Sequence, residues 1–446
     1  MRTRLRQWLA TGEAAALLHD KAAGAPAAAP ISVDFPLPTA PATGEDWLSL
    51  LPHDQPFWYR ARPAKGEFLL GIGHALHVAS AGPNRFAALD HAWRGMVEHW
   101  HASANATAFA GFAFADDNDA PLPNALLALP ALLLRRTHEG STLTLTAPAG
   151  RIDESAALWP AWLEGTASAL SPKITWPQEH PLAQQAWQTR VDAALRDIAA
   201  GRLAKVVLTR QRKLLADQPV SPAWLLARLN EQQPDSVVFA HGNGHQVFLG
   251  ATPERLVRLR GRQAEVDALA GTAWPGSPTL DIEKNRQEQA YVVDAVRQAL
   301  THLCQTPPSI SATEEHAAGQ LLHLRNRIAG HLRPEASLFD LLRSLHPTPA
   351  VGGYPSGAAQ AWLNAHGERR SAWYSGGFGI LQPNGDSEFS VALRSALLDG
   401  NTVELQAGAG IVAGSDAQLE WAETEAKFGT LLAALLTAAK GINRAA

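Results

Sequence analysis

Three glutamates in the second half of the chain have the chemistry and spacing of a site for a hard cation. Glu420 and Glu423 are three residues apart in a segment expected to be helical, so both carboxylates lie on one helix face. Glu288 lies in the middle of another expected helix, from which it could face the same cation. Carboxylate oxygens without His or Cys suit magnesium. The residues alone leave a second interpretation open, in which Glu420 and Glu423 form a solvated acidic stripe beside Trp421.

Lys205 and Glu254 are the residues whose positions indicate proton transfer. Lys205 opens the apolar run Lys-Val-Val-Leu. A lysine there either extends to solvent or is a desolvated amine with a lowered pKa that acts as a general base. Glu254 follows a Gly and a Pro at the end of an expected strand, in Gly-Ala-Thr-Pro-Glu-Arg. It is either a surface acid paired with Arg255 or a partly buried acid with a raised pKa.

Three further features indicate ligand contacts. Arg394 lies within the alternating run Phe-Ser-Val-Ala-Leu-Arg-Ser. An inward-pointing guanidinium keeps its charge and needs a carboxylate or phosphate partner. Gly408 and Gly410 end an expected strand in Gln-Ala-Gly-Ala-Gly-Ile, where they either permit a bulge or let a ligand approach the backbone. His346 lies in an expected loop, either as a core histidine or as a ligand group.

The elements that must position these residues are clearest in the second half of the chain. The spacing of apolar residues predicts helices over residues 182–200, 281–303 and 418–439, and Gly201 is a C-terminal stop for the first. Runs of β-branched and alternating residues predict strands over residues 205–209, 237–240, 247–250, 373–381, 388–397 and 402–408. Strands joined by hairpins, with long helices alongside, indicate an α+β architecture.

The first part of the chain gives weaker signals. Residues 22–41 are mostly Ala and Pro and predict a loop or an extended lead-in to a strand. Residues 45–170 mix short apolar runs with turn residues, which predicts strands and a few helices without a catalytic constellation. Pro-rich residues 171–181 mark a junction.

Composition narrows the class of protein. The 446 residues are 46% hydrophobic and 18% charged, which is typical of a globular chain with a large core. A net charge of −4 with acids and bases intermixed does not indicate a nucleic-acid or membrane partner. Cys304 is the single cysteine, which excludes a disulfide within the chain and a cysteine-built metal site. Charged residues interrupt both the N-terminal segment and every other apolar stretch, so we expect neither export nor a membrane span but a cytoplasmic protein.

Taken together, the motifs form an ordered series that resembles the chorismate-utilising enzyme family. Its members include anthranilate synthase component I, aminodeoxychorismate synthase, salicylate synthase and isochorismate synthase. The resemblance covers residues 182–438, and the first 180 residues share only length and general character. In chain order, the series is Lys-Val-Val-Leu, Thr-Pro-Glu, Leu-Ala-Gly-Thr, the helix with Glu288, His-Pro-Thr-Pro-Ala-Val-Gly-Gly, Ala-Leu-Arg-Ser, Ala-Gly-Ala-Gly-Ile-Val and Glu-Trp-Ala-Glu-Thr.

The resemblance implies one large α/β (α+β) domain of the anthranilate synthase component I type, with two stacked antiparallel sheets flanked by helices. Residues 1–180 would be the N-terminal scaffold half of this fold. Residues 181–440 would be the chorismate-binding catalytic region.

The resemblance also implies a set of ligand contacts. A Mg²⁺ ion, held by Glu288, Glu420 and Glu423, would bind the ring carboxylate of chorismate. Asn285 stands where the family has a fourth acidic residue, so we expect a thinner metal shell that water or Asn285 completes. An arginine would bind the enolpyruvyl carboxylate through two parallel N–H donors, and a tyrosine hydroxyl and backbone amides would donate to it as well. The implied substrate-binding residues are Thr272, His346, Tyr374, Arg394, Gly408, Gly410 and Lys427.

Lys205 decides which reaction the resemblance implies. Family members that aminate chorismate lack a lysine at this position, whereas those that use water as the nucleophile carry one. The chain is therefore expected to be an isomerase, an isochorismate synthase, that adds water at ring carbon 2 and expels the hydroxyl from carbon 4. Lys205 would be the general base and Glu254 the general acid, with their pKa values displaced in opposite directions.

Three alternatives stay open. Salicylate synthase performs the same hydration and then eliminates pyruvate. Anthranilate synthase component I is disfavoured by Lys205, and a catalytically silent chorismate- or metal-binding protein is disfavoured by the whole set of base, acid and glutamates. We expect chorismate as the substrate and no obligatory glutaminase partner. The product could serve menaquinone, siderophore or salicylate biosynthesis.

Overall fold

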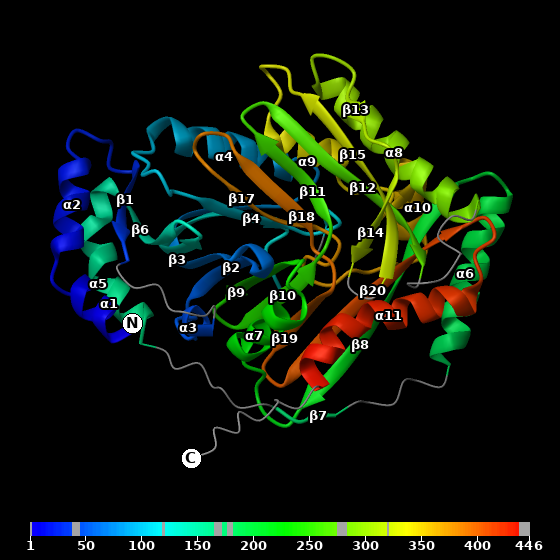
Figure 1. The fold of residues 1–446 in the computed structure, drawn as a ribbon, viewed down its shortest axis with the longest axis horizontal. Coiled ribbons are helices and arrows are strands. Elements are labelled where there is room, and N and C mark those ends of the chain that lie inside the picture. Colours follow the sequence, from blue (N-terminus) through cyan, green and yellow to red (C-terminus); the bar gives the residue numbers. More distant parts are fainter. Residues whose placement is uncertain are drawn as a thin grey trace.

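The fold is described from a computed structural model over residues 2–37, 45–117, 121–164, 172–175, 182–273, 283–318 and 321–436 (Figure 1). Its helices are α1 (Arg2–Leu9), α2 (Glu13–Lys21), α3 (Glu45–Leu48), α4 (Arg85–His99), α5 (Ile152–Trp162), α6 (Ala183–Ala199), α7 (Pro222–Gln232), α8 (Glu283–Leu303), α9 (Leu338–Leu345), α10 (Ser356–Ala365) and α11 (Ala417–Leu436), with short 3₁₀ turns at Pro63–Lys65 and Ala149–Arg151. Its strands are β1 (Pro30–Pro36), β2 (Pro56–Arg62), β3 (Glu67–Ser80), β4 (Ala108–Phe112), β5 (Ala125–Thr137), β6 (Gly140–Pro148), β7 (Ile174–Thr175), β8 (Lys205–Ala216), β9 (Val237–Asn243), β10 (Gln246–Thr252), β11 (Arg255–Arg260), β12 (Gln263–Ala273), β13 (Ser309–Ile310), β14 (Glu314–Ala318), β15 (Leu321–His331), β16 (Gly353–Tyr354), β17 (Gly377–Leu381), β18 (Ser387–Val391), β19 (Ser395–Asp399) and β20 (Thr402–Val412).

The strands pair antiparallel and join into one hydrogen-bonded sheet with two arms. The first arm runs β1–β6–β5–β3–β2–β9–β10–β19–β20–β8, and β7 and β16 pair with the outer edge of β8. The second arm leaves β5 through β4 and runs β4–β17–β18–β11–β12–β15, with β13 and β14 on β15. The single mixed domain is confirmed, and its two expected sheets are the two arms of one network.

The sheet joins strands from both sides of residue 180. β2 pairs with β9 in the first arm, and β4 pairs with β17 in the second. The N-terminal residues therefore contribute strands to both arms, and no boundary of the sheet falls at residue 180.

The long helix α8 shows how sequence periodicity becomes packing. Its buried residues are spaced three or four apart, so they form one face, and the helix packs against β12 and β15. Each apolar side chain buried in this way contributes about 1.5–3 kcal/mol. The helix predicted over residues 281–303 is confirmed from Glu283 onward, and residues 281–282 lie outside the described residues. Its buried face consists of Asn285, Gln289, Val292, Val296 and Leu300.

The helices α6, α7 and α11 cover the first arm, where α11 crosses β20 and β8 (Figure 1). The predicted helix over residues 418–439 begins one residue earlier, at Ala417, and residues 437–439 lie outside the described part of the chain. The indole of Trp187 on α6 donates a hydrogen bond of 2.9 Å to the Ala417 carbonyl, which fixes the start of α11 against α6.

A hydrophobic cluster fills the space between the two arms. Val206 and Leu208 on β8 pack in the same cluster as Val266 and Ala268 on β12, and α8 and α9 contribute to it. The arms therefore face one another across a continuous core. A separate cluster underlies α1, α2, α5, α7 and α11 on the other side of the first arm.

Two of the places where the chain passes from one arm to the other are short links that lie side by side. β10 belongs to the first arm and β11 to the second, and Pro253 and Glu254 join them. β18 and β19 are likewise divided between the arms, and residues 392–394 join them. Backbone hydrogen bonds tie the two links together, from Val391 N–H to the Glu254 carbonyl (3.0 Å) and from Ala251 N–H to the Arg394 carbonyl (3.2 Å).

Two predicted strands differ from the structure at this place. The strand expected over residues 388–397 is two strands, because Arg394 adopts a left-handed backbone with φ of 50° and turns the chain into the other arm. The strand expected over residues 373–381 begins only at Gly377, after a turn in which Ser375 has φ of 54°. The strands at residues 205–209 and 402–408 are confirmed and are longer, at Lys205–Ala216 and Thr402–Val412.

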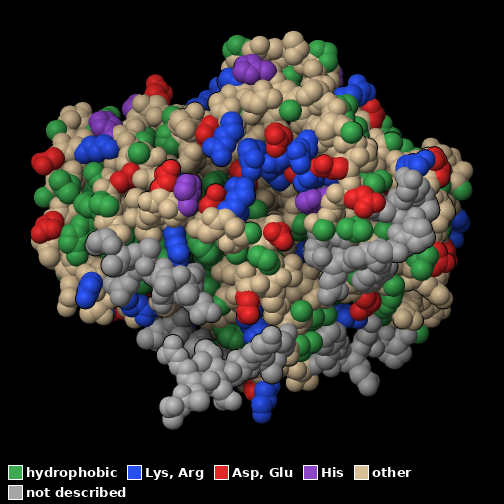
Figure 2. All heavy atoms as spheres, viewed as in Figure 1, with side chains coloured by type: hydrophobic (Ala, Val, Ile, Leu, Met, Phe, Trp, Pro, Cys, Tyr) green, Lys and Arg blue, Asp and Glu red, His purple; other side chains and the backbone are tan. Residues whose placement is uncertain are grey.

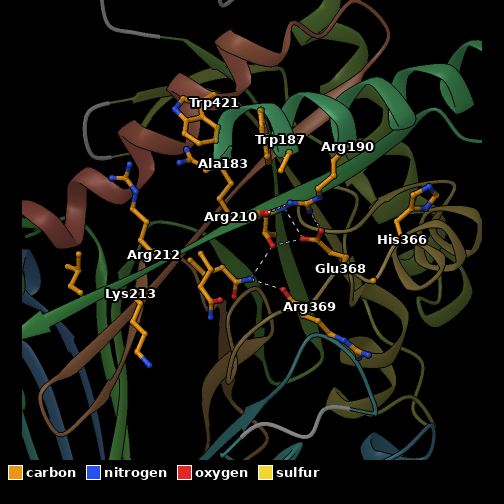
Figure 3. A pocket seen from close by; sticks show the side chains of 16 residues that line it. Ala183, Trp187, Arg190, Arg210, Arg212, Lys213, His366, Glu368, Arg369 and Trp421 are labelled. Carbon is orange, nitrogen blue, oxygen red and sulfur yellow. Dashed lines mark hydrogen bonds and ion pairs between the residues drawn. The ribbon is translucent and has the colours of Figure 1, made fainter. Parts of the chain in front are cut away.

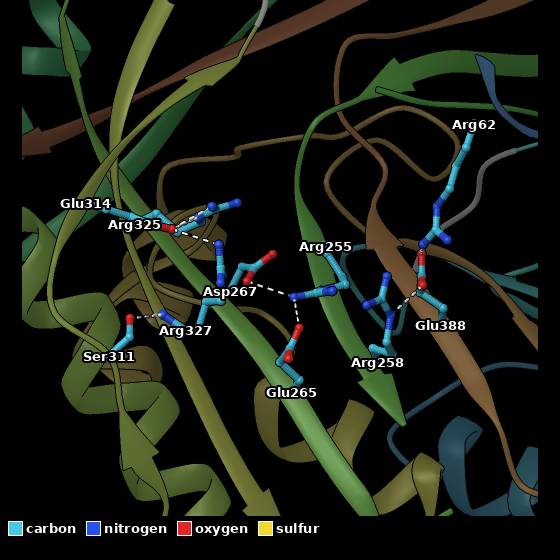
Figure 4. A network of polar contacts seen from close by, with 10 residues as sticks. All are labelled: Arg62, Arg255, Arg258, Glu265, Asp267, Ser311, Glu314, Arg325, Arg327 and Glu388. Carbon is cyan, nitrogen blue, oxygen red and sulfur yellow. Dashed lines mark hydrogen bonds and ion pairs between the residues drawn. The ribbon is translucent and has the colours of Figure 1, made fainter. Parts of the chain in front are cut away.

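Charged side chains gather in the upper middle of the face drawn in Figure 2. On the second arm they form interstrand ion pairs (Figure 4): Arg255 contacts Glu265 and Asp267, and Arg325 contacts Glu314. The described helices include no segment long and apolar enough to cross a bilayer.

Candidate active site

A cavity opens between the arms beside the two links. Nine of the residues singled out from the sequence line it: Lys205, Glu254, Glu288, Tyr374, Arg394, Gly408, Gly410, Glu423 and Lys427. They come from β8, from both links, from β20, from α8 and α11, and from the turn before β17. The free volume is about 60 Å³, so a ring-sized ligand requires some of these side chains to move.

Lys205, the first residue of β8, is only 1% exposed. Its Nζ lies 2.8 Å from Glu288 Oε1 on α8. This pair lies directly over Gly410 of the adjacent strand β20: a Cβ there would stand 2.7 Å from Glu288 Oε1 and 2.9 Å from Lys205 Cε. Glycine at 410 is therefore required by the close approach of the ion pair.

Glu254, in the link between β10 and β11, is buried within the cavity wall. Burial raises its pKa to about 7, against the opposing effect of the positive charges of Arg394, Lys205 and Lys427. A carboxyl group with this pKa is substantially protonated at neutral pH. Glu254 can therefore donate a proton, as the sequence pattern proposed.

Tyr374 is buried, and Arg394, which is half-buried, interacts with it electrostatically. Burial acts to lower the pKa of Arg394 and raises that of Tyr374 to about 12, and each group interacts with the other and with Glu254. Among the described residues, no side chain or carbonyl forms a hydrogen bond or ion pair with the Arg394 guanidinium. A half-buried guanidinium of this kind is suited to an anionic ligand, because it cannot lose its charge.

The three glutamates expected to bind a cation each pair with a lysine. Lys205 contacts Glu288, Lys284 Nζ lies 2.6 Å from Glu420 Oε1, and Lys427 Nζ lies 2.6 Å from Glu423 Oε1. Burial, reinforced by Glu423, raises the pKa of Glu420 to about 7. Burial also acts to raise the pKa of Glu423, but Lys427 overcomes this effect and holds it below its usual range.

These glutamates fit magnesium in donor type, since all three supply hard carboxylate oxygens. In this structure a lysine ammonium group pairs with each of the three carboxylates. Within the described residues no three acidic or histidine side chains stand close enough to share one ion. The Lys284 ammonium also interacts with Glu288 and Glu423, so it lies in the field of all three carboxylates. A cation would have to take over the contact that Lys284 makes with Glu420.

The remaining sequence-derived residues lie around the cavity. His346 packs in the core against Phe112 and Phe114, with Nε2 3.1 Å from the Phe114 carbonyl, and is not among the lining residues. Asn285 is buried on α8 beneath Gly271. Thr272 belongs to β12, with its backbone opposite His323.

The cavity also contains residues that sequence reasoning missed. His323 Nδ1 lies 2.9 Å from the Gly271 carbonyl, and burial lowers the pKa of this ring to about 3, so the neutral imidazole donates from Nδ1. Arg370 stacks 3.6 Å from the Phe114 ring centroid and donates to Ser375 Oγ at 2.5 Å. The histidine in the strand Leu-Leu-His-Leu-Arg was a usable signal, whereas Ser375 gave none.

Comparison with known proteins identifies the family of the chain. Residues 33–436 match the family described as chorismate binding enzyme. The chain therefore belongs to the chorismate-binding enzyme family, and the resemblance seen in its motifs is confirmed. It is a chorismate-utilising enzyme.

Individual relatives and solved structures show which members of the family the chain is similar to. Isochorismate synthase MenF of Escherichia coli (strain K12) is 30% identical over 422 residues, which are 90% of this chain and 92% of that protein. The salicylate biosynthesis isochorismate synthase of Pseudomonas aeruginosa is 35% identical over 354 residues, 76% of this chain and 71% of that protein. The solved structure of MenF, the menaquinone-specific isochorismate synthase from Escherichia coli, has a TM-score of 0.81 at 29% identity and covers 96% of this chain and 100% of that chain. Anthranilate synthase component I from Streptococcus pneumoniae TIGR4 shares the fold, with a TM-score of 0.67 at 18% identity over 82% of this chain and 92% of that chain.

Proposed function

We propose that the chain is an isochorismate synthase, which converts chorismate to isochorismate. The observation that carries the proposal is the meeting of Lys205 with Glu254, whose pKa is raised to about 7, in one buried cavity. Hydration at one ring carbon and loss of a hydroxyl from another require one proton acceptor and one proton donor near neutral pH. The names of the relatives from Escherichia coli and Pseudomonas aeruginosa support the same activity.

In the proposed reaction, the Lys205 amine removes a proton from water as the water oxygen bonds to ring carbon 2. The ring double bond shifts, and the bond between carbon 4 and its hydroxyl oxygen breaks. Glu254 donates the proton with which this hydroxyl leaves as water. One water enters and one leaves, so the reaction needs no oxidant or reductant. Lys205 must first give up its ion pair with Glu288.

Arg394 is the proposed partner of the enolpyruvyl carboxylate, together with the Tyr374 hydroxyl. A guanidinium offers two parallel N–H donors to a carboxylate. The backbones of Gly408 and Gly410 line the same cavity without side chains, so a ligand can approach their amides. Lys427, which lines the cavity beside Glu423, completes the positive wall.

Magnesium is the proposed cofactor, held by Glu288, Glu420 and Glu423. When bound, it supplies positive charge to the ring carboxylate of the substrate and to Glu288. To hold the ion, Glu420 would have to give up its contact with Lys284, and Glu288 its contact with Lys205. Asn285, buried on the same helix face, remains the proposed outer contribution to the metal shell.

The activity is tested by incubating the purified chain with chorismate and Mg²⁺, without a glutaminase, and identifying the products by NMR and mass. We expect isochorismate. Lys205→Ala should abolish its formation and leave chorismate binding within a few-fold, since general-base assistance is worth about 10²–10⁴ in rate. Isochorismate production by this variant at a near wild-type rate would refute the mechanism.

The same assay separates the second candidate function. A relative named for salicylate biosynthesis makes pyruvate release worth measuring, because salicylate synthase eliminates pyruvate after the hydration. Stoichiometric pyruvate without an added lyase would assign that activity instead. Menaquinone, siderophore and salicylate biosynthesis are the proposed destinations of isochorismate, and the cytoplasm is the proposed location.

The metal is tested by calorimetric titration of Mg²⁺ in the presence of chorismate. Glu420→Gln and Glu423→Gln should weaken Mg²⁺ binding strongly, because each removes one anionic donor. Lys284→Met should tighten it, because the competing ammonium is gone. The exposed Glu335→Gln serves as the control. Unchanged Mg²⁺ affinity in both cavity variants would remove these glutamates from the metal site.

A further inference from the structure

A second and larger cavity, of about 610 Å³, lies next to the active site along the same two strands (Figure 3). Alternate residues of a strand share one face. Lys205 and Val207 of β8 line the active site, and Thr209, Gln211 and Lys213 of the same face line the second cavity. Arg210, Arg212 and Leu214 of the other face of β8 line it as well. The volume is in the range of small-molecule binding sites.

Positive charge surrounds this second cavity. Figure 3 shows Arg190 and Arg369 at one end and Arg212 and Lys213 at the other, with Arg210 between them. Glu368 is the acidic residue of the described lining, and it is engaged by Arg190 and by the Thr209 hydroxyl. Just outside the lining, Glu425 pairs with Arg210 and Arg212. Lys213 and Arg369 are exposed at the mouth.

Aromatic surface lies between the two charged ends. Trp187 of α6 and Trp421 of α11 line the cavity, with ring centroids 6.3 Å apart. The Arg210 guanidinium lies 3.0 Å from the Trp421 ring centroid, so one face of this indole is already covered by a cation. An apolar ring between two separated cationic groups suits a flat molecule with an acidic group at each end.

The wall between the two cavities is a short segment, residues 368–371. Arg369 lines the second cavity and Arg370 lines the active site. Gln406 of β20 holds the segment, since its side chain accepts from the Ser371 N–H (2.9 Å) and donates to the Arg369 carbonyl (2.9 Å). On the other side, Arg370 donates to Ser375 Oγ. A ligand that contacts Arg369 therefore acts on a segment with contacts in both cavities.

We propose that the second cavity binds a small ring compound with two carboxylates, distinct from the molecule in the active site, and that its binding orders residues 368–371. This inference does not depend on the proposed reaction. One carboxylate is held at the end that carries Arg190 and Arg369 and the other by Lys213 at the opposite end, while the ring packs on the Trp187 and Trp421 side.

The probe for the test is benzene-1,3-dicarboxylate, titrated calorimetrically into the full chain, with benzene-1,3-dimethanol as the uncharged control. The test variant is Lys213→Glu/Arg369→Glu, which reverses two exposed charges at the mouth. Its matched control is Arg343→Glu, an exposed reversal on α9. Arg394→Ala identifies any binding in the active site. Hydrogen exchange of the 368–371 amides reports ordering without any activity measurement.

We expect the dicarboxylate to bind and the diol not to bind. The dissociation constant should rise at least tenfold in Lys213→Glu/Arg369→Glu and stay within twofold in Arg343→Glu and Arg394→Ala. Exchange at residues 368–371 should slow in the wild type on binding. The absence of millimolar binding, an unchanged affinity in the mouth variant, or a loss confined to Arg394→Ala would each overturn the proposal. Binding without slower exchange would overturn the ordering of the segment. If chorismate turnover fails while this pattern holds, only the proposed reaction is lost.

Discussion

Single residues in the active-site cavity owe their chemistry to burial and to their neighbours. Burial raises the pKa of Glu254 and of Tyr374, so at neutral pH Tyr374 keeps its proton and Glu254 is substantially protonated. The same burial cannot neutralise Arg394, which stays a cation. One wall of the cavity thus presents two proton-bearing acids and a fixed positive charge. These features suit an anionic ligand that loses a hydroxyl group, because an acid in the wall can protonate that group as it departs.

The acid in this wall gives the first prediction. Because Glu254 must be protonated to act as an acid, turnover limited by it should fall about tenfold per pH unit above pH 7. Glu254→Gln should lower the rate by about 10²–10⁴ and remove this limb from the pH profile. A rate profile of the wild type that stays flat from pH 6 to pH 9 would contradict the assignment.

Protein stability provides an independent check on the same group. The folded chain binds this proton more tightly than the unfolded chain, so stability contributed by the protonated group is lost as pH rises from about 4.5 towards 7 and above. Thermal melts should therefore show Glu254→Gln to be more stable than the wild type at pH 8. The difference should shrink towards pH 5, where the wild-type carboxyl is protonated.

The arginine gives a prediction about binding. Arg394→Lys keeps the charge and loses the planar pair of donors, so the KM for chorismate should rise by roughly one to two orders of magnitude. Arg343→Lys, on the exposed surface of α9, is the matched control and should leave KM unchanged. A KM for Arg394→Lys within twofold of the wild type would place the enolpyruvyl carboxylate elsewhere.

Among the elements, the adjacent strands β8 and β20 do most to shape the cavity. β8 presents Lys205, and β20 presents only backbone to the cavity at Gly410 and Gly408, which pair with Val207 and Thr209. The helices α8 and α11 then bring the three glutamates from two directions. A glycine on β20 is the reason that the Lys205–Glu288 pair can lie flat on the sheet.

Gly410→Ala tests this arrangement. The new Cβ would meet Glu288 Oε1 at 2.7 Å and Lys205 Cε at 2.9 Å, so the ion pair must shift while the strand itself is not strained. We expect turnover to fall by at least tenfold, with a melting temperature within a few degrees of the wild type. Gly429→Ala on α11, where an added Cβ meets no atom within 4 Å, is the control and should retain full activity. Equal activity in the two variants would contradict the close approach.

Sequence periodicity predicted α6, α8 and α11 to within one or two residues at their described ends, because each buries one face with regular spacing. It failed at Arg394, where the alternation of residues 388–397 continues through a break that only the left-handed backbone reveals. It also could not show that Lys284 reaches Glu420, since the contact joins residues 136 positions apart. Nine of the twelve residues proposed for the site meet in the cavity, because motif order reflects a fold that the family shares.

For the whole molecule, the pairing of strands from the two halves makes the halves of the chain dependent on each other. β9 has β2 as a neighbour, and β17 has β4, so a chain without residues 1–180 exposes an unpaired edge in each arm. We expect a fragment of residues 181–446 to show no cooperative thermal transition by circular dichroism. A fragment that melts cooperatively and binds chorismate would show that the N-terminal half is dispensable for the fold.

The two links between the arms give the cavity a mechanical property. Glu254 and Arg394 sit where the chain leaves one arm for the other, whereas Lys205 is anchored within β8 between β16 and β20. A small change in the angle between the arms would therefore change the distances from Lys205 to Glu254 and to Arg394. Packing of the core between the arms, which begins at Val206 beside Lys205, thus affects the span across which protons are exchanged.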